Sequence, residues 1–255
     1  MLHIVSHRPL REPPVGDEES TEFLRIDGDP CASTIVFLPW CMPFKLAQAR
    51  RIIPESYLAC FEMPRGIVSS DPARCLEALY AVVDEATAVF ERSGLAPQRV
   101  LVVGLSIGNA AATMFANRIG ARLCSIASAD RGDLTLWESP AARHVRLRAE
   151  AKGLQIGDFT RALRGRHTID NLANLGAGSR FVVGLRDELL PLPRREGLLH
   201  AVRSIVPAAD IVHIDATHFG TMREAIRRGL CDPAEMGQAR PCYAEEIRNE
   251  ARAGR

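Results

Sequence analysis

The stretch from Val100 to Arg118 constrains the fold of this chain more than any other part of the sequence. It begins with an apolar, β-branched run that is typical of a buried strand, and it ends in an alanine-rich run without proline that is typical of a helix. Between them stands Gly104-Leu-Ser-Ile-Gly108, a G-x-S-x-G pattern. A strand that turns directly into a helix at a serine strains the backbone there and exposes the hydroxyl. We therefore expect a reactive side chain at Ser106.

The rest of the chain alternates strand-like and helix-like segments. Apolar runs predict strands at residues 2–6, 22–26, 33–38, 57–61, 100–103, 122–127, 180–184 and 210–214. Helical spacing and helix-forming residues predict helices at 45–52, 71–93, 109–118, 194–205 and 221–230. Such alternation predicts an α/β fold with a mostly parallel central sheet that is covered by helices on both faces.

Reactive side chains follow three of the predicted strands, in the chain order serine, aspartate, histidine. Ser106 follows the strand at 100–103, Asp187 the strand at 180–184, and His218 the strand at 210–214. Ligands bind parallel sheets at the carboxyl ends of the strands, so these side chains are expected to share one edge. A neutral imidazole there would take the serine proton, and a carboxylate behind it would orient the ring. Glu188 competes with Asp187 for the role of the acid.

From about residue 33 to 230 the chain resembles the α/β-hydrolase family, which has its nucleophile elbow, acid and histidine in this same order. The resemblance implies that Ser106 is the nucleophile, Asp187 the acid and His218 the base. It favours Asp187 over Glu188, because the family's acid stands four residues before a proline, as Asp187 does before Pro191. It also implies one α/β-hydrolase domain over residues 1–255, with a short helical cap at 130–165. The charged, proline-containing tail at 231–255 is expected to be loosely held.

The sequence departs from the family pattern after the strand at 33–38. The family's strand usually ends in His-Gly, whereas this chain continues Pro39-Trp-Cys-Met-Pro43. The backbone N–H of Ile107 is expected to be one oxyanion donor. Since Pro39 has no N–H, the second donor is expected at Cys41 or Trp40, with Cys41 preferred. Trp40 and Phe219 are expected to contact the substrate. A smaller departure is Arg65 in the turn Glu62-Met-Pro-Arg-Gly66, where the family has glycine.

Composition excludes several other classes of protein. The formal net charge of +1 gives no reason to expect nucleic acid or acidic membrane as a partner. No run of about 18 apolar residues predicts a membrane span. The seven cysteines are scattered without a C-x-x-C pair, which argues against a zinc site or a disulfide framework. With no signal-peptide pattern at the start, these features lead us to expect a cytoplasmic protein without a metal or another cofactor.

We therefore predict a serine hydrolase that cleaves a small-molecule carboxylic ester or thioester through an acyl-enzyme. Lactonase, C–C hydrolase and acyltransferase chemistry use the same triad and stay open, as does a catalytically silent protein that binds a small molecule or a partner. Between residues 143 and 166, seven basic side chains stand against two acidic ones, a net charge of +5. That charge either attracts an anionic substrate or keeps the cap solvated. Neither the substrate nor the oligomeric state follows from the sequence.

Overall fold

The computed structural model describes residues 24–28, 33–39, 58–232 and 236. The strand predicted at 2–6, the helix predicted at 45–52, and Trp40 and Cys41 lie outside these residues, as does most of the tail.

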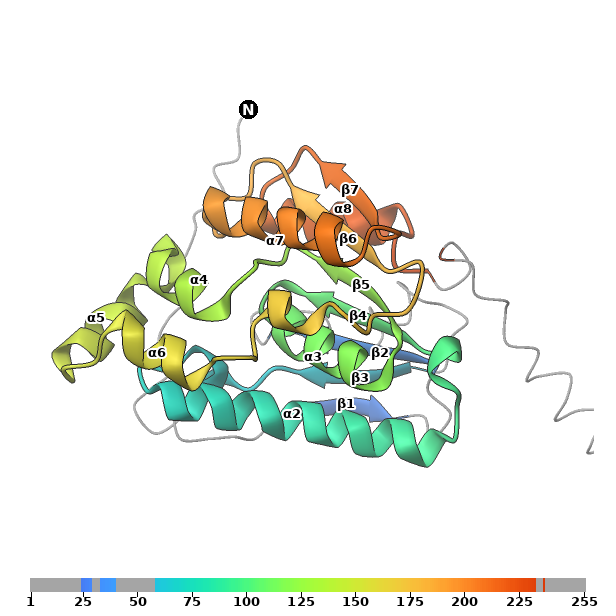
Figure 1. Ribbon diagram of the computed structural model, residues 1–255, viewed down its shortest axis with the longest axis horizontal. Coiled ribbons are helices and arrows are strands. Elements are labelled where there is room, and N and C mark those ends of the chain that lie inside the picture. Colours follow the sequence, from blue (N-terminus) through green and yellow to red (C-terminus); the bar gives the residue numbers. More distant parts are fainter. Residues whose placement is uncertain (1–23, 29–32, 40–57, 233–235, 237–255) are drawn as a thin grey trace, which may run out of the picture.

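The described residues form one sheet of seven strands. In chain order these are β1 (Leu24–Gly28), β2 (Thr34–Leu38), β3 (Leu58–Glu62), β4 (Leu101–Leu105), β5 (Arg122–Ile126), β6 (Arg180–Gly184) and β7 (Asp210–Ile214). Their spatial order is β1-β3-β2-β4-β5-β6-β7. β1 pairs antiparallel with β3, and every other neighbouring pair is parallel (Figure 1). The mostly parallel sheet predicted from the apolar runs is confirmed.

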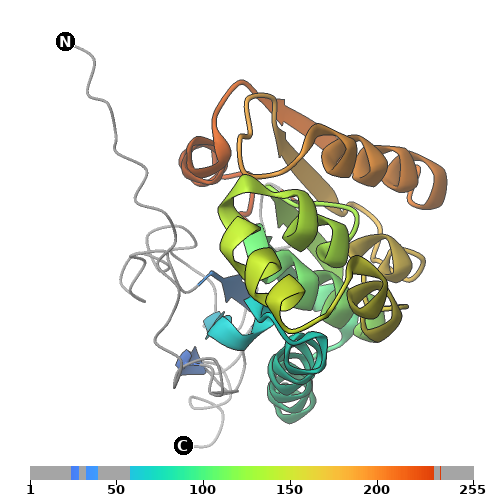
Figure 2. The same cartoon turned by 90° about the vertical axis from the view of Figure 1, so that its left-hand side faces the viewer.

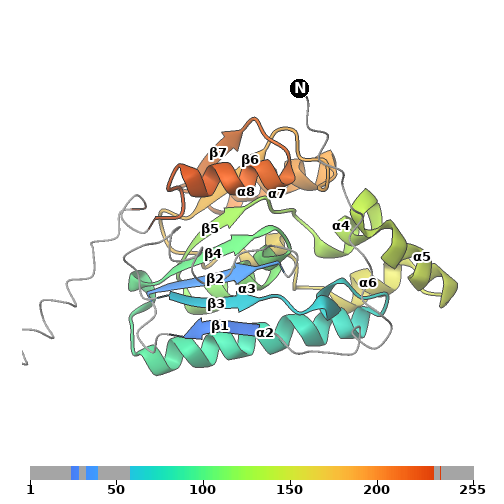
Figure 3. The same ribbon diagram turned by 180° about the vertical axis from the view of Figure 1, so that it is seen from behind.

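Helices cover both faces of this sheet, as predicted. α2 (Pro72–Ser93), α3 (Asn109–Ile119) and α7 (Leu192–Ile205) lie on one face, and α8 (His218–Arg227) lies on the other (Figures 1 and 3). Alternate residues of β4 point to the two layers: Val102 packs with α2 and α3, whereas Val103 packs in the layer that contains α8. This two-sided burial explains why the strand reads as a continuous apolar run.

The helix ends follow local capping. The Asp71 carboxylate accepts a hydrogen bond from the backbone N–H of Ala73 at 2.9 Å, and Pro72 is the first residue of α2. α8 begins at His218, three residues earlier than predicted, because the Thr217 hydroxyl accepts from the backbone N–H of Gly220 at 3.3 Å. His218 therefore stands at the start of a helix and not in a loop before one.

Three helices occupy the segment between β5 and β6: α4 (Gly132–Glu138), α5 (Arg143–Ala151) and α6 (Ile156–Ala162). They lie beyond the carboxyl ends of the parallel strands (Figures 1 and 2). Their small apolar core includes Leu136, Val145 and Phe159, and it packs against Cys75 of α2. The segment predicted as a cap is thus helical and sits on the N-terminal end of α2.

A buried ionic group fixes α4 against α6. The Asp133 side chain has no exposed surface; it accepts hydrogen bonds from Arg131 at 3.1 and 2.5 Å and from the Thr160 hydroxyl at 2.6 Å. Burial acts to raise the pKa of Asp133, but the bonds from Arg131 and Thr160 outweigh it and lower that pKa. Asp133 therefore remains ionised and paired inside the cap.

Part of the segment after α8 packs on the sheet. Cys231 and Met236 are buried in the layer that contains α8, and Arg122 donates a hydrogen bond to the carbonyl of Met236. No helix in the described part of the chain has the length and apolar character that a bilayer crossing requires.

Candidate active site

The turn between β4 and α3 holds Ser106 in a rare backbone conformation. β4 ends at Leu105, and one 3₁₀ turn over Ser106–Gly108 leads directly into α3. The φ of Ser106 is +52°, in the left-handed region that residues with a side chain seldom adopt. Such strain is found mainly where it has a functional reason. This is the conformation that the G-x-S-x-G pattern predicts.

The two glycines of the pattern allow close approaches that no side chain would permit. A Cβ added at Gly104 would lie 2.5 Å from Oδ1 of Asn109 and 2.7 Å from Cβ of Ala112. A Cβ added at Gly108 would lie only 2.3 Å from the carbonyl oxygen of Phe37 in β2. The glycines thus let the start of α3 press against β4 and β2, which fixes the position of the turn.

Asn109 ties this turn to the neighbouring strand, and the sequence analysis did not identify it. Its Nδ2 donates to the carbonyl of Ser106 at 2.9 Å and to the carbonyl of Ile126, the last residue of β5, at 2.8 Å. Asn109 as a whole is 2% exposed. An amide residue placed directly after G-x-S-x-G was the available signal, but only the fold shows which carbonyl it reaches.

The structure brings together the three residues that the sequence proposed as a triad. Oγ of Ser106 lies 2.7 Å from Nε2 of His218, and Nδ1 of His218 lies 2.7 Å from Oδ2 of Asp187. The Asp187 carboxylate has no exposed surface and the His218 side chain is 2% exposed. Since an ionised carboxylate only accepts, Nδ1 carries the proton and Nε2 is free to accept the proton of the serine hydroxyl.

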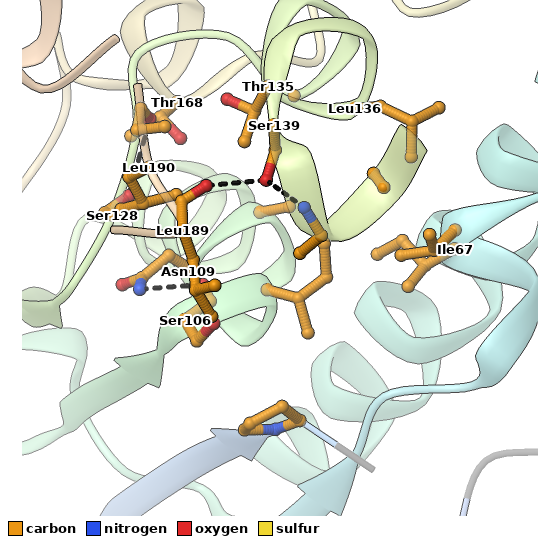
Figure 4. A pocket seen from close by; sticks show the side chains of 18 of the residues that line it. Ile67, Ser106, Asn109, Ser128, Thr135, Leu136, Ser139, Thr168, Leu189 and Leu190 are labelled. Carbon is orange, nitrogen blue, oxygen red and sulfur yellow. Dashed lines mark hydrogen bonds between the residues drawn. The ribbon is translucent and has the colours of Figure 1, made fainter. Parts of the chain in front are cut away.

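Backbone and cap groups hold Asp187 in place. Its Oδ1 accepts from the backbone N–H groups of Leu189 and Leu190, each at 3.0 Å. The Ser139 hydroxyl of the cap donates to the carbonyl of Leu189 at 2.6 Å, so the cap is joined to the loop after β6 that carries Asp187 (Figure 4). Ser139 is a second residue that the sequence analysis did not single out.

Glu188 has a different partner from Asp187. Its Oε2 accepts from the backbone N–H of His218 at 3.1 Å, at the N-terminal end of α8. A carboxylate is favoured at that end of a helix, where unpaired N–H groups carry partial positive charge. Glu188 therefore bonds the backbone of His218, whereas Asp187 bonds its imidazole.

A cavity of about 200 Å³ opens over Ser106 and His218. Its described walls come from the turn at Ser106, the loop after β6, the N-terminal part of α2 and the cap. Most of them are apolar, for example Ile67, Leu136, Leu189 and Leu190 (Figure 4). Leu79 and Leu163 also line the cavity. The polar side chains among the walls include those of Asn109, Ser128, Thr135, Ser139 and Thr168. No aspartate or glutamate is found among the described lining residues.

Four further residues were predicted for the site, and the structure describes two of them. Ile107 and Phe219 line the cavity, and the Phe219 ring stands edge-on to the His218 ring with 5.4 Å between the centroids. Trp40 and Cys41 lie outside the described residues, whereas Pro39 is buried and lines the cavity.

A second set of lining residues was not predicted to form the site. Arg65, His144, Arg166 and His167 also line the cavity. Burial lowers the pKa of His167, so its imidazole is held in the neutral form. The Cys75 thiol lines the cavity as well, but burial raises its pKa to about 12, which makes it a poor nucleophile at neutral pH. The part of the chain that the structure describes contains no group of His, Cys, Asp and Glu side chains arranged to hold a metal ion.

Comparisons with known proteins find similarity at the level of structure. No protein-family model and no curated protein sequence matches the chain. A solved puromycin-hydrolyzing peptidase of Mycobacterium tuberculosis is similar over 82% of this chain and 34% of its own, with 13% identity and a TM-score of 0.57. Dipeptidyl peptidase 4 of Porphyromonas gingivalis is similar over the same shares, with 14% identity and a TM-score of 0.52. The chain thus spans about a third of the length of these two proteins.

A neighbour of comparable length is an esterase. Esterase 2 of Thermogutta terrifontis, solved after phosphoramylation by tabun, is similar over 84% of this chain and 89% of its own, with 14% identity and a TM-score of 0.50. Identities this low speak for the fold alone. Together with the mostly parallel sheet and the strained turn between β4 and α3, they show that this chain has the α/β-hydrolase fold.

Proposed function

We propose that the protein is a serine hydrolase that cleaves a carboxylic ester or thioester through an acyl-enzyme intermediate. The observation that carries the proposal is the unbroken chain of short hydrogen bonds from Ser106 through His218 to Asp187, which ends in a cavity at the serine hydroxyl. Hydrogen-bonded groups in this order are what nucleophilic catalysis by a serine requires.

In the first half of the reaction, Oγ of Ser106 attacks the substrate carbonyl carbon while Nε2 of His218 takes the hydroxyl proton. The electron pair of the C=O bond moves to oxygen, and the resulting oxyanion is bound by the backbone N–H of Ile107 together with a donor from the segment after Pro39. When the tetrahedral intermediate collapses, the bond to the leaving alcohol or thiol breaks and His218 gives that group its proton. The acyl group then remains on Ser106 as an ester.

In the second half, His218 takes a proton from water, whose oxygen attacks the acyl carbon. Collapse of the second tetrahedral intermediate returns the proton to Oγ of Ser106 and releases a carboxylic acid. The buried carboxylate of Asp187 stabilises the imidazolium in both halves and keeps Nδ1 protonated. Every bond made and broken is accounted for by substrate, water and these side chains.

The walls of the cavity support a small apolar acyl or alcohol group as the substrate portion near the serine. A volume of about 200 Å³ lies below the range of drug-sized ligand sites, about 300–1,000 Å³. Two of the structural neighbours are named as peptidases, and amide cleavage follows the same steps. An ester or thioester is preferred here because the described walls offer no carboxylate to bind the ammonium group of a peptide N-terminus.

The test is hydrolysis of a panel of para-nitrophenyl esters and acyl thioesters of graded chain length by the wild-type protein and two serine variants. Ser106→Ala removes the proposed nucleophile, whereas Ser128→Ala removes another serine hydroxyl that lines the same cavity. We expect Ser106→Ala to lower kcat by about 10⁴-fold or more and Ser128→Ala to keep most of the activity. Full activity in Ser106→Ala would contradict the proposal. Alternatively, the wild-type protein hydrolyses no member of the panel and yet binds the short carboxylic acids that correspond to these esters. That result would favour the alternative, a catalytically silent protein that binds a small molecule.

A further inference from the structure

Arg166 is a cationic side chain on the wall of the cavity, and its position is fixed by protein contacts. Its guanidinium carbon lies 5.4 Å from the centroid of the Tyr80 ring, and its Nε donates to the Tyr80 hydroxyl. Its Nη1 donates to the carbonyl of Arg164 at 3.1 Å. A guanidinium stacked on an aromatic ring and bonded on two sides loses little further freedom when it binds a ligand.

This guanidinium has no carboxylate partner among the described residues. No aspartate or glutamate in that part of the chain forms an ion pair with Arg166. An arginine carries five N–H donors. Two are used by Tyr80 and Arg164, which leaves three without a described protein acceptor. A half-buried charge in a largely apolar wall, with three N–H donors that no described residue accepts, is suited to bind an anion.

The neighbouring charged groups do not neutralise it. Asp133, in the cap, is already bonded by Arg131 and Thr160. His167 is neutral at neutral pH and adds no charge of either sign. Arg166 therefore brings to the cavity wall a positive charge that forms no ion pair with any described carboxylate.

We propose that Arg166 binds a carboxylate of the substrate, so that the ester cleaved at Ser106 bears a free carboxylate on its acyl or alcohol part. This inference rests on the function proposed above. A carboxylate fits better than a phosphate, because one uncompensated guanidinium matches a single negative charge and the cavity of about 200 Å³ is small. The apolar side chains that line the same cavity contact the hydrocarbon portion.

The experiment uses two pairs of esters that differ only in charge. On the acyl side, the para-nitrophenyl monoester of adipic acid is compared with the para-nitrophenyl ester of adipamic acid. On the alcohol side, para-acetoxybenzoate is compared with para-acetoxybenzamide. Each pair is measured with the wild-type protein, Arg166→Gln, Arg166→Lys and Arg161→Gln. Arg161 is the matched control, since it is an exposed arginine of α6 that pairs with Asp158 and does not line the cavity.

We expect Arg166→Gln to lower kcat/KM for the carboxylate ester of at least one pair by about 10- to 100-fold, mainly through KM, and to change its amide partner by less than about 2-fold. Arg166→Lys is expected to lie between, because lysine keeps the charge and loses the fork. Arg161→Gln should change both esters of a pair by less than about 2-fold. Equal losses on both esters, or no loss on either, would overturn the inference and leave the hydrolase proposal standing.

A binding measurement decides the inference even if no ester is cleaved. Adipate and para-hydroxybenzoate are titrated into the Ser106→Ala protein and into Ser106→Ala combined with Arg166→Gln, and thermal unfolding verifies that both are folded. Binding that is lost in the double variant supports the carboxylate site whatever the fate of the hydrolase proposal. Binding that is absent, or unchanged by Arg166→Gln, overturns it.

Discussion

Asp187 and Glu188, although adjacent, bind the same histidine at two different groups. Oδ2 of Asp187 lies 2.7 Å from the ring nitrogen Nδ1 of His218, whereas Oε2 of Glu188 lies 3.1 Å from its backbone nitrogen. Only Asp187 can set the tautomer of the ring. Glu188 instead anchors the first residue of α8.

This difference predicts opposite effects of two isosteric substitutions. Asp187→Asn leaves the shape of the site intact but removes the charge that orients and stabilises the imidazolium, so kcat for ester hydrolysis should fall by about 10² to 10⁴-fold. Glu188→Gln keeps an oxygen that accepts from the His218 backbone, and kcat should change by less than about 3-fold. Steady-state kinetics with one para-nitrophenyl ester separates the two. A large loss in Glu188→Gln with a small loss in Asp187→Asn would assign the acid to Glu188.

The close approach at Gly108 predicts a loss of stability in Gly108→Ala. The new Cβ would lie 2.3 Å from the carbonyl oxygen of Phe37, so α3 and β2 must move apart, at a cost of about 1–3 kcal/mol in the free energy of unfolding. Gly157→Ala is the matched control in α6, where a Cβ meets no atom within 4 Å and helix propensity gains about 0.5–1 kcal/mol. Urea unfolding of both variants checks this. Equal urea midpoints for Gly108→Ala and the wild-type protein would show that the turn at Ser106 tolerates displacement of α3.

His167 predicts a pH-dependent component of stability. Burial holds its pKa below the ordinary value of 6.5, so the unfolded chain binds a proton at this residue that the folded chain rejects. Above pH 6.5 the His167 imidazole is neutral in the folded and the unfolded chain, so its burial favours neither state. As the pH falls from 6.5 through the lowered pKa, the unfolded chain gains the proton first, and the free energy of unfolding decreases. Between pH 7.5 and pH 5.5, the free energy of unfolding measured in urea should therefore fall less in His167→Gln than in the wild-type protein. The same drop in both would mean that His167 titrates alike in the folded and unfolded chain.

Local patterns in the sequence predicted the sheet and the approach of three side chains. Apolar runs and turn residues placed the strands, and the G-x-S-x-G pattern predicted the strained φ of Ser106. Parallel strands bring their carboxyl ends to one edge, which is why Ser106, Asp187 and His218 meet. Their catalytic roles remain predictions.

What the sequence could not predict depends on contacts between distant segments. The early start of α8 results from the Thr217 cap, which competes with the apolar spacing used to place the helix. The basic residues between 143 and 166 define a net charge, but the sequence does not show where any of their side chains points. In the fold, Arg161 pairs with Asp158 on the surface and Arg146 bonds the carbonyl of Trp137, whereas Arg166 lines the cavity and bonds the Tyr80 hydroxyl of α2.

The central claim is that Ser106 is an activated nucleophile, and covalent labelling tests it most directly. The protein is incubated with a fluorophosphonate, digested, and examined by mass spectrometry for the modified peptide. We predict one adduct, on the peptide that contains Ser106, which is absent from Ser106→Ala and forms much more slowly in Asp187→Asn because the serine proton is no longer removed efficiently. A wild-type protein that stays unmodified, or a Ser106→Ala protein that is modified at the wild-type rate, would contradict the account.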